Sequence, residues 1–122
     1  ISDGQSNRNL YGNGPIALTI YDHSGRDTLD LSYGGSNSHI DLRPESFSNI
    51  NGLFGNLGIA RDTIIENAIG GRGNDRIIGN TANNMINGNI GADTILGGDG
   101  NDTLRGGGEN DRIGGGPGRD SV

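Results

Sequence analysis

Residues 70–122 repeat every nine positions, and this period constrains the fold more than any other feature of the chain. In register the six blocks read GGRGNDRII, GNTANNMIN, GNIGADTIL, GGDGNDTLR, GGGENDRIG and GGPGRDSV. Every block opens with glycine, its sixth residue is Asp or Asn, and its eighth residue is aliphatic. Tandem repeats with a short fixed period are typical of solenoids, in which stacked repeats bury one continuous core. The pattern therefore predicts a repeating fold rather than a flexible glycine-rich linker.

The composition excludes several classes of function. The net charge is −6 and the pI is near 4.6, which argues against nucleic acid or an anionic membrane as a partner. No apolar run approaches the ~20 residues of a transmembrane helix, so we expect no membrane insertion. The chain has no cysteine, hence no disulfide and no thiolate metal site. It also lacks the H-E-x-x-H, G-x-S-x-G and G-x-x-x-x-G-K-[ST] motifs, so we predict no catalytic centre in this chain.

The chain before the repeats has no period, yet it shows short extended patterns. We divide the sequence into an irregular lead-in (1–15), a non-consensus β portion (16–69) and the nonapeptide array (70–122). Residues 25–30, GRDTLD, already reproduce the second part of the nonapeptide. The other expected strands of the β portion lie at 16–21, 39–42, 58–60 and 63–65.

One segment breaks the extended pattern. Pro44 followed by Glu45 permits one or two helical turns, because proline is favoured at a first helical position. Phe47, Ile50, Leu53 and Phe54 would then share one apolar face, which we interpret as part of the core. Apart from this segment, short strands joined by glycine turns predict an all-β fold.

Each nonapeptide divides into a six-residue G-G-x-G-x-D turn and a three-residue x-U-x strand. Glycine permits positive φ, so the turn can tighten until its backbone carbonyls point inward. Carbonyl and carboxylate oxygens are the ligands that a hard cation such as Ca²⁺ prefers. Two turns and two strands form one 18-residue coil, so the turns of repeats n and n+2 stack about 4.8 Å apart. Carboxylates at that separation would repel one another unless cations lay between them.

A metal-free solenoid is the alternative, with Asp serving only as a turn former. A flat ice-binding or adhesive face would need a uniform column of side chains. The seventh position instead carries Arg76, Met85, Thr94, Thr103, Arg112 and Ser121. In addition, one aliphatic residue per nine buries little apolar surface, whereas ordering a glycine-rich backbone is costly. We therefore expect the array to be largely unfolded without metal, with metal binding coupled to folding.

The repeats resemble those of RTX proteins, a Ca²⁺-binding solenoid class. The stretches LTIYDHSGRDTLDLS (18–32), IDLRPESFSNINGLFGNLGIA (40–60) and IENAIGG (65–71) resemble the C-terminal domain of serralysin-type metalloproteases. The resemblance covers residues 16–122 and implies a parallel β-roll (a β-solenoid) that folds with calcium outside the cell. It also implies three partners: calcium ions, a zinc protease domain N-terminal to this region in the full-length protein, and a type I secretion exporter.

The resemblance further implies about four calcium sites in the repeats. In each site the earlier turn supplies its second and fourth carbonyls, the later turn its first and third, and both supply the sixth side chain. The four sets are Gly71, Gly73, Asp75, Gly88, Ile90 and Asp93; Asn80, Ala82, Asn84, Gly97, Asp99 and Asp102; Asn89, Gly91, Asp93, Gly106, Gly108 and Asp111; and Gly98, Gly100, Asp102, Gly115, Pro117 and Asp120.

Two features modify this arrangement. Asp93 and Asp102 would each bridge two ions, whereas Asn84 removes a charge and should weaken the second site. One or two further sites are implied upstream, around Asp22, Ser24, Gly25, Asp27, Ile64 (by its carbonyl) and Glu66.

We thus expect a calcium-dependent folding and secretion module from the C-terminal part of a secreted, extracellular serralysin-like protease. The abrupt start and the stop inside a sixth repeat indicate a fragment truncated at its C-terminal end. Two alternatives stay open: an RTX module of a lipase or polysaccharide-modifying enzyme, and a structural or adhesive solenoid. An upstream H-E-x-x-H motif would favour the protease, and a long tandem extension would favour the structural solenoid.

Overall fold

The computed structural model describes residues 7–9, 18–21, 24–32, 34–50 and 57–122. Within these ranges the chain forms strands of two or three residues and no helix, so none could cross a membrane. The strands are β1 (Asn7–Asn9), β2 (Leu18–Ile20), β3 (Thr28–Asp30), β4 (His39–Asp41), β5 (Phe47–Ser48), β6 (Leu57–Ile59), β7 (Asn67–Ile69), β8 (Arg76–Ile78), β9 (Met85–Asn87), β10 (Thr94–Leu96), β11 (Thr103–Arg105) and β12 (Arg112–Gly114).

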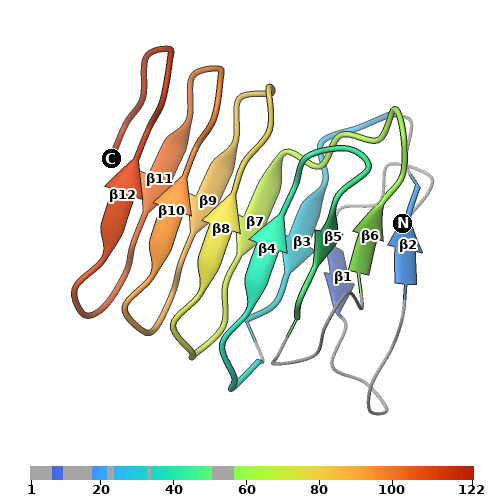
Figure 1. Ribbon diagram of the computed structural model, residues 1–122. Helices are drawn as coiled ribbons and strands as arrows, with labels where there is room; N and C mark the ends of the chain where they lie inside the picture. Colours follow the sequence, from blue (N-terminus) through green and yellow to red (C-terminus); the bar gives the residue numbers. More distant parts are fainter. Residues whose placement is uncertain (1–6, 10–17, 22–23, 33, 51–56) are drawn as a thin grey trace.

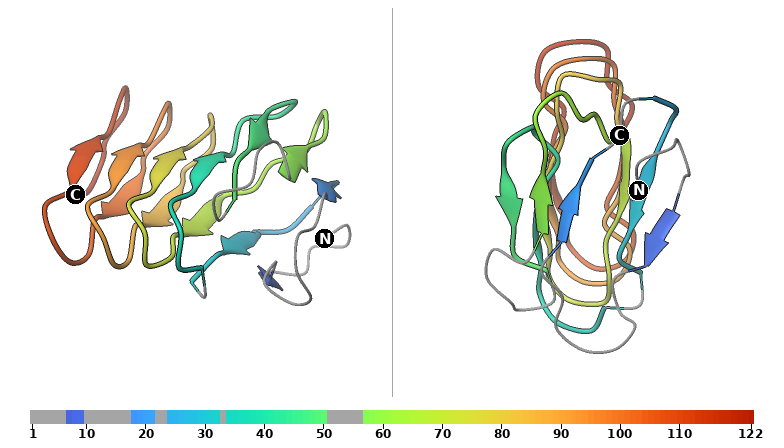
Figure 2. Two further views of the ribbon diagram at one scale, coloured as in Figure 1. Left: turned by 60° about the horizontal axis from the view of Figure 1, so that its bottom comes forward. Right: turned by 90° about the vertical axis from the view of Figure 1, so that its right-hand side faces the viewer.

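Two parallel sheets form the walls of a β-roll, and from β7 onward the chain alternates between them (Figure 1). One sheet has the order β1-β3-β7-β9-β11 and the other β12-β10-β8-β4. Thr94 pairs with Arg76 on one side and with Arg112 on the other, each 18 residues away. This register confirms the 18-residue coil of two turns and two strands. Seen along its axis, the molecule is a flattened tube of stacked coils (Figure 2).

Most strands of the roll bury their central residue and leave the two flanking ones exposed or half-exposed, but β4 also buries Asp41 and β12 only half-buries Ile113. The eighth-position residues Ile77, Ile86, Ile95 and Leu104 are at most 1% exposed and form the core between the sheets. Val122, at the same position of the last repeat, is instead 77% exposed. It follows the isolated bridge between Thr103 and Ser121, and no described strand stacks beyond it. The predicted aliphatic core is therefore confirmed in the first four repeats, whereas Ile113 is only partly buried and Val122 is exposed.

The non-consensus portion continues the same two sheets. β3 pairs with β7 in parallel, and β4 pairs with β8. Ile40 lies opposite Ile77 and is fully buried, as is Leu29 opposite Ala68. The roll thus begins before the nonapeptide array, and the boundary predicted at residues 69 and 70 is not a break in the sheets. The predicted division into segments itself stays a prediction.

The helix predicted near Pro44 is wrong where the chain is described. Glu45 has φ 64°, which no right-handed helix accommodates, and its N–H donates to the Ile59 carbonyl. The segment instead forms β5, which pairs antiparallel with β6 in a small sheet of order β2-β6-β5. Phe47 is 71% exposed, against expectation, whereas Ile50 is buried. The predicted contributions of Leu53 and Phe54 lie outside the described residues.

The expected strand at 63–65 is also wrong. These residues form a turn that connects β6 to β7, in which Thr63 and Ile65 are buried and Ile64 is 46% exposed. The turn stacks against the second repeat, so its buried side chains serve the roll without strand pairing. The expected strands at 16–21, 39–42 and 58–60 correspond to β2, β4 and β6 with slightly different ends.

Candidate metal centre

The turns of the roll stack in two rows, one at each edge of the sheets (Figure 1). The first turn row consists of residues 34–38, 70–75, 88–93 and 106–111. The second turn row consists of residues 24–27, 62–66, 79–84, 97–102 and 115–120. Since each coil contributes one turn to each row, sixth-position side chains of alternate repeats lie above one another, as predicted.

Within each row, one oxygen of every sixth-position carboxylate reaches back to the preceding turn. The Asp93 Oδ1 atom accepts the Asp75 N–H at 2.7 Å, and the Asp111 Oδ1 atom accepts the Asp93 N–H at 2.9 Å. In the second row the Asn84 N–H donates to Asp102 (2.7 Å) and the Asp102 N–H donates to Asp120 (2.9 Å). Each carboxylate therefore contacts two consecutive turns, whereas the bridging of two ions by Asp93 and Asp102 stays a prediction.

The second oxygen of the two central carboxylates has no hydrogen bond. The Oδ2 atoms of Asp93 and Asp102 are buried and find no partner among the described residues. A β-carbon added at Gly88 would collide with the Asp93 Oδ2 atom and lie 2.8 Å from the Gly106 carbonyl oxygen. The corresponding space at Gly97 is lined by the Asp102 Oδ2 atom and the Gly115 carbonyl.

An unpaired buried carboxylate oxygen is costly, and native structures normally provide it with a partner. Here each such oxygen lies near a carbonyl oxygen of the next turn, around a space that only glycine leaves open. A hard cation satisfies this set of donors, because oxygens are its preferred ligands and positive charge offsets the buried carboxylate. The residues therefore fit the metal that the sequence analysis predicts.

The first two repeats differ in their turns. The Asp75 Oδ2 atom accepts the Gly71 N–H at 2.9 Å, and the Asn84 Oδ1 atom accepts the Asn80 N–H at 2.9 Å. We call these two turns, residues 70–75 and 79–84, the closed turns, and the turns at 88–93, 97–102, 106–111 and 115–120 the open turns. Within the nonapeptides of residues 70–122, positive φ at the second and fourth positions occurs only in the open turns, at Asn89, Gly91, Gly98, Gly100, Gly107, Glu109, Gly116 and Gly118.

Two asparagine side chains of the second predicted site donate to segments that precede its first turn. The Asn84 Nδ2 atom donates to the Glu66 carbonyl and to the Asn80 Oδ1 atom, both at 2.9 Å. The Asn80 Nδ2 atom donates to the Ile65 carbonyl at 2.8 Å and to that of Leu42 at 3.3 Å. The Asn84 Oδ1 atom still faces the Gly97 carbonyl across Gly79. This site thus keeps a ligand pair but carries one carboxylate fewer.

The carbonyls predicted as ligands at the second and fourth positions face the next turn of their row. A β-carbon at Gly98 would lie 2.7 Å from the Asn80 carbonyl oxygen, and one at Gly100 would lie 2.7 Å from that of Ala82. The carbonyls of Gly73, Asn89, Gly98 and Gly100 likewise lie against the second- or fourth-position glycine of the next turn. The Gly71 and Asn89 carbonyls also accept hydrogen bonds from the next turn, at 3.2 and 3.0 Å. The ligand roles of the third-position carbonyls of Ile90, Asp99, Gly108 and Pro117 stay predictions.

The structure brings part of the predicted upstream set together. The Asp27 N–H donates to a Glu66 carboxylate oxygen at 2.9 Å, and Asp27 is fully buried. Gly25 has φ 96°, as a tight turn requires, and Ser24 is exposed. Asp22 lies outside the described residues. Whether these residues and the Ile64 carbonyl bind a cation stays a prediction.

Burial raises the pKa of the central carboxyl groups. The pKa of Asp93 rises from 3.8 to about 6, first because of burial and then because of the charges of Asp75, Asp111 and Glu109. Burial likewise raises the pKa of Asp102, with Asp120 and Asp99 adding to the effect, and burial raises that of Asp75. A raised carboxyl pKa means that the metal-free turn disfavours the charge that a cation would favour.

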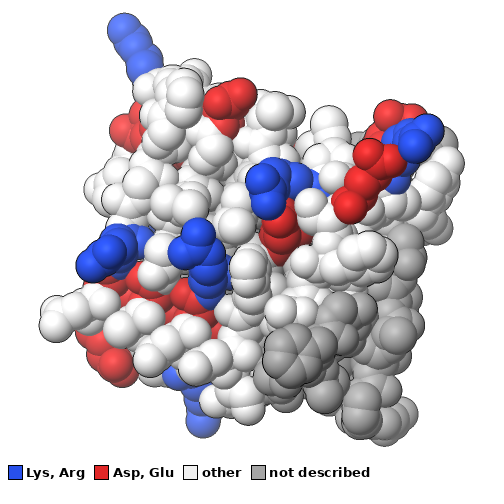
Figure 3. Space-filling view, viewed as in Figure 1, with Lys and Arg blue, Asp and Glu red and all other residues white. Residues whose placement is uncertain are grey.

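Acidic side chains gather beside the turns that precede β8, β10 and β12, with basic side chains next to them (Figure 3). Among the described residues no three His, Cys, Asp or Glu side chains group together as a metal site. Each predicted site has two sixth-position side chains at most and takes its other ligands from the backbone. The candidate centre therefore depends on turn conformation as much as on carboxylates.

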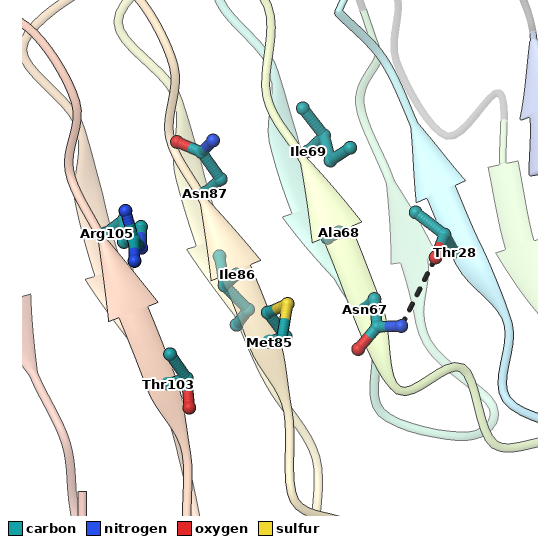
Figure 4. A pocket seen from close by; sticks show the side chains of 9 residues that line it. All are labelled: Thr28, Asn67, Ala68, Ile69, Met85, Ile86, Asn87, Thr103 and Arg105. Carbon is teal, nitrogen blue, oxygen red and sulfur yellow. Dashed lines mark hydrogen bonds between the residues drawn. The ribbon is translucent and has the colours of Figure 1, made fainter. Parts of the chain in front are cut away.

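One surface depression, of about 510 Å³, borders the second turn row, where Asn80, Gly98 and Asp99 help to line it, whereas another lies away from the turns. That second depression, of about 410 Å³, lies on the outer face of β7, β9 and β11, and its lining includes Asn67, Ile69, Met85 and Arg105 (Figure 4). The Asn67 Nδ2 atom donates to Thr28 there at 3.2 Å. No carboxylate lines this depression, so it offers no cation site.

The fifth position of the turns holds functional residues that were not among the predicted site residues. The Asn74 Oδ1 atom accepts the Ala92 N–H at 2.9 Å, and the Asn83 and Asn101 Oδ1 atoms accept the next fifth-position N–H at 2.8 and 2.9 Å. Asn37, outside the repeats, accepts the Asn74 N–H in the same way at 2.8 Å. The available signal was the column Asn74, Asn83, Ala92, Asn101, Asn110 and Arg119, in which four of the six residues are Asn.

Comparison with known proteins agrees with this architecture. The metallopeptidase AprA of Pseudomonas marginalis is 48% identical over 63 residues, or 52% of this chain. Serralysin of Photorhabdus laumondii is 48% identical over 66 residues (54% of the chain), and serralysin B of Dickeya chrysanthemi is 46% identical over 63 residues (52%). The matched region represents only 13–14% of the length of these relatives.

The family described as Peptidase M10 serralysin C terminal matches residues 5–120, which is nearly the whole chain. The matched span includes both the non-consensus strands and the nonapeptide array. The chain belongs to the serralysin C-terminal family of M10 peptidases.

Proposed function

We propose that this chain is a calcium-binding module whose folding depends on Ca²⁺, and that it forms the C-terminal part of a secreted zinc metalloprotease. The observation that carries the proposal is the pair of buried, unpartnered Oδ2 atoms of Asp93 and Asp102, each near a carbonyl of the next turn. Calcium would supply the missing positive charge there. The residues that would hold it in the open turns are the sixth-position carboxylates and the turn carbonyls.

Family membership supports the coarser part of this proposal, because the matched relatives are named metallopeptidases and serralysins. The catalytic domain, its substrate and its zinc would belong to the rest of the full-length protein. The calcium requirement suits a protein exported by a type I system. The chain would stay unfolded at low cytosolic calcium and fold outside the cell, where modules with dissociation constants of about 10⁻⁴–10⁻³ M operate.

Circular dichroism of the chain in calcium-free buffer, followed by titration to millimolar Ca²⁺, tests the proposal. We expect little β signal without calcium and a cooperative gain on titration, with calorimetry reporting several bound ions. Mg²⁺ at equal concentration is the control, because its strict octahedral geometry fits carbonyl-rich turns poorly. A complete β spectrum without calcium, unchanged on its addition, would contradict coupled folding.

A matched pair of variants assigns the effect to the turns. Asp102→Asn and Asp99→Asn remove the same charge from neighbouring positions, yet only the Asp102 side chain is buried. We expect D102N to lower the number or affinity of bound ions strongly and D99N to change them little. Equal effects would mean that general electrostatic attraction, rather than the proposed ligands, holds the calcium.

A further inference from the structure

The fifth-position asparagines and the sixth-position carboxylates connect the turns in opposite directions. In the second turn row the Asn101 N–H donates backward to the Asn83 Oδ1 atom, at 2.8 Å. The next N–H along the chain, that of Asp102, donates forward to the Asp120 Oδ1 atom at 2.9 Å. Successive amides of one turn are therefore bound by both of its neighbours, which fixes its distance from each.

The asparagine oxygen lies beside a carbonyl that the proposed site uses. A β-carbon at Gly118 would lie 3.2 Å from the Asn101 Oδ1 atom and closer still to the Gly100 carbonyl oxygen. At Gly100 the same contacts are made by the Asn83 Oδ1 atom (3.0 Å) and the Ala82 carbonyl (2.7 Å). The fourth-position carbonyl and the fifth-position side chain of one turn thus contact the same backbone of the next. The orientation of the fourth-position carbonyl therefore depends on the position of the neighbouring fifth-position side chain.

We propose that Asn74, Asn83 and Asn101 are positioning residues for the calcium sites. They do not act as ligands. Their Oδ1 atoms hold the next turn in register, so that the fourth-position carbonyl beside each of them stays directed at the cation. This inference rests on the proposed function, since it assumes that calcium occupies the stacked turns.

In the first turn row, one of these hydrogen bonds between fifth positions is missing. Ala92 stands at the fifth position between Asn74 and Asn110, and it offers no side-chain acceptor. Accordingly, no hydrogen bond to the Asn110 N–H is found in the described part of the chain. The second row is continuous from Asn83 through Asn101 to Arg119. The two rows therefore allow both a loss and a gain of one asparagine to be tested.

The loss is tested with Asn101→Ala, and Asn110→Ala serves as the matched control. Asn110 occupies the same column and is exposed, but its side chain has no turn stacked on it among the described residues. At saturating calcium we expect both variants to give the parent circular dichroism spectrum and ion count. N101A should release calcium about fivefold faster into excess chelator, the equivalent of about one neutral hydrogen bond. N110A should match the parent.

A positioning role also changes the coordination of the bound ion. With Eu³⁺ as the probe, luminescence lifetimes in H₂O and D₂O count coordinated water molecules. N101A should raise the mean count, because a misdirected carbonyl admits water. Asn101→Asp, which keeps an acceptor oxygen, should restore it. A lower melting temperature with unchanged water count and calcium release would show a merely structural role and overturn the proposal.

The gain is tested with Ala92→Asn, which keeps the inference testable if N101A does not fold. The new side chain would accept the Asn110 N–H and complete the first row. We expect calcium release to slow by a similar factor, and release unchanged from the parent would contradict the inference. The parent titration separates the two proposals: absence of calcium binding there refutes the proposed function, whereas normal binding with indifferent A92N and N101A refutes only the positioning role.

Discussion

The closed turns and the open turns share a nine-residue period but satisfy their side chains differently. In the closed turns the Asp75 Oδ2 atom and the Asn84 Oδ1 atom each accept a backbone N–H of their own turn. In the open turns the equivalent oxygens of Asp93 and Asp102 are buried without a partner. The closed turns also contact the non-consensus portion: Ser38 donates to Asp75, and the Asn84 amide donates to the Glu66 carbonyl.

This difference indicates that the two parts of the roll satisfy the polar groups of their turns in different ways. Near the non-consensus portion, amides and backbone groups complete the turns, so folding there depends less on a cation. Farther along, the equivalent oxygens of Asp93 and Asp102 have no hydrogen-bond partner in the part of the chain that the structure describes. Under the proposed function, the roll would begin on a base that folds without a cation and continue into coils that need calcium.

Removal of calcium should produce the largest contrast between the two kinds of turn. We expect amides in residues 88–122 to lose nearly all protection against hydrogen exchange, because unpaired buried carboxylates repel and are poorly solvated. Amides of β7 and β8 should keep measurably more protection. Exchange of the chain with and without calcium, followed by mass spectrometry, checks this. Uniform loss across residues 57–122 would remove the proposed distinction.

The two ends of the second turn row give the next largest effect. Asp102→Ala should lower the calcium stoichiometry or cooperativity more than Asp120→Ala, since Asp102 contacts turns on both sides and Asp120 only the preceding one. Isothermal titration calorimetry measures the difference. Equal losses from both variants would argue against bridging carboxylates.

The pH dependence should have opposite signs with and without calcium. In the metal-free fold the pKa of Asp93 is about 6 rather than 3.8, so the folded chain binds more protons than the unfolded chain between these values. Without calcium, β structure should therefore decrease as pH rises from about 4 through 6. With calcium it should increase over the same window, because protons compete with the cation for the carboxylate.

Circular dichroism in calcium-free and calcium-containing buffers measures both trends. Asp93→Asn is the control: it should flatten the calcium-free curve, since Asn carries no charge at any pH. The same sign of slope in both buffers would mean that other groups dominate the titration.

The period of nine was enough to predict the 18-residue coil, the aliphatic core and the stacking of sixth-position side chains. The non-consensus portion was harder to interpret. Residues 34–38 form the first member of a turn row, yet Ser38 stands where the repeats have Asp, and only Asn37 retains a recognisable role. The helix expected near Glu45 failed because pairing with β6 outweighs local propensity.

The distinction between closed and open turns could not be predicted from residue identity. Asn80 and Asn89 are the same residue at the same position, but only Asn89 has positive φ, at 80°. Asn80 is held by the carbonyls of Leu42 and Ile65, which belong to segments far away in sequence. Tertiary contacts therefore decide which of two accessible conformations the turn adopts.

The smallest expected effect concerns an open turn in which a non-glycine residue adopts a left-handed backbone conformation. Glu109 has φ 67° at a position where neighbouring repeats have glycine, and its side chain is exposed. Left-handed backbone costs a non-glycine residue about 1–2 kcal/mol. Glu109→Gly should therefore raise the free energy of unfolding in saturating calcium by about 1 kcal/mol, part of the gain being offset by the greater entropy of the unfolded chain.

Urea unfolding in saturating calcium measures this gain, and Glu109→Gln separates its two sources. Glutamine removes the charge that contributes to the raised pKa of Asp93 but keeps the β-carbon and its strain. If backbone strain dominates, E109G stabilises the roll and E109Q does so much less. If both variants stabilise it equally, repulsion between Glu109 and the calcium-site carboxylates is the larger cost, and the fourth position tolerates a side chain more readily than its φ implies.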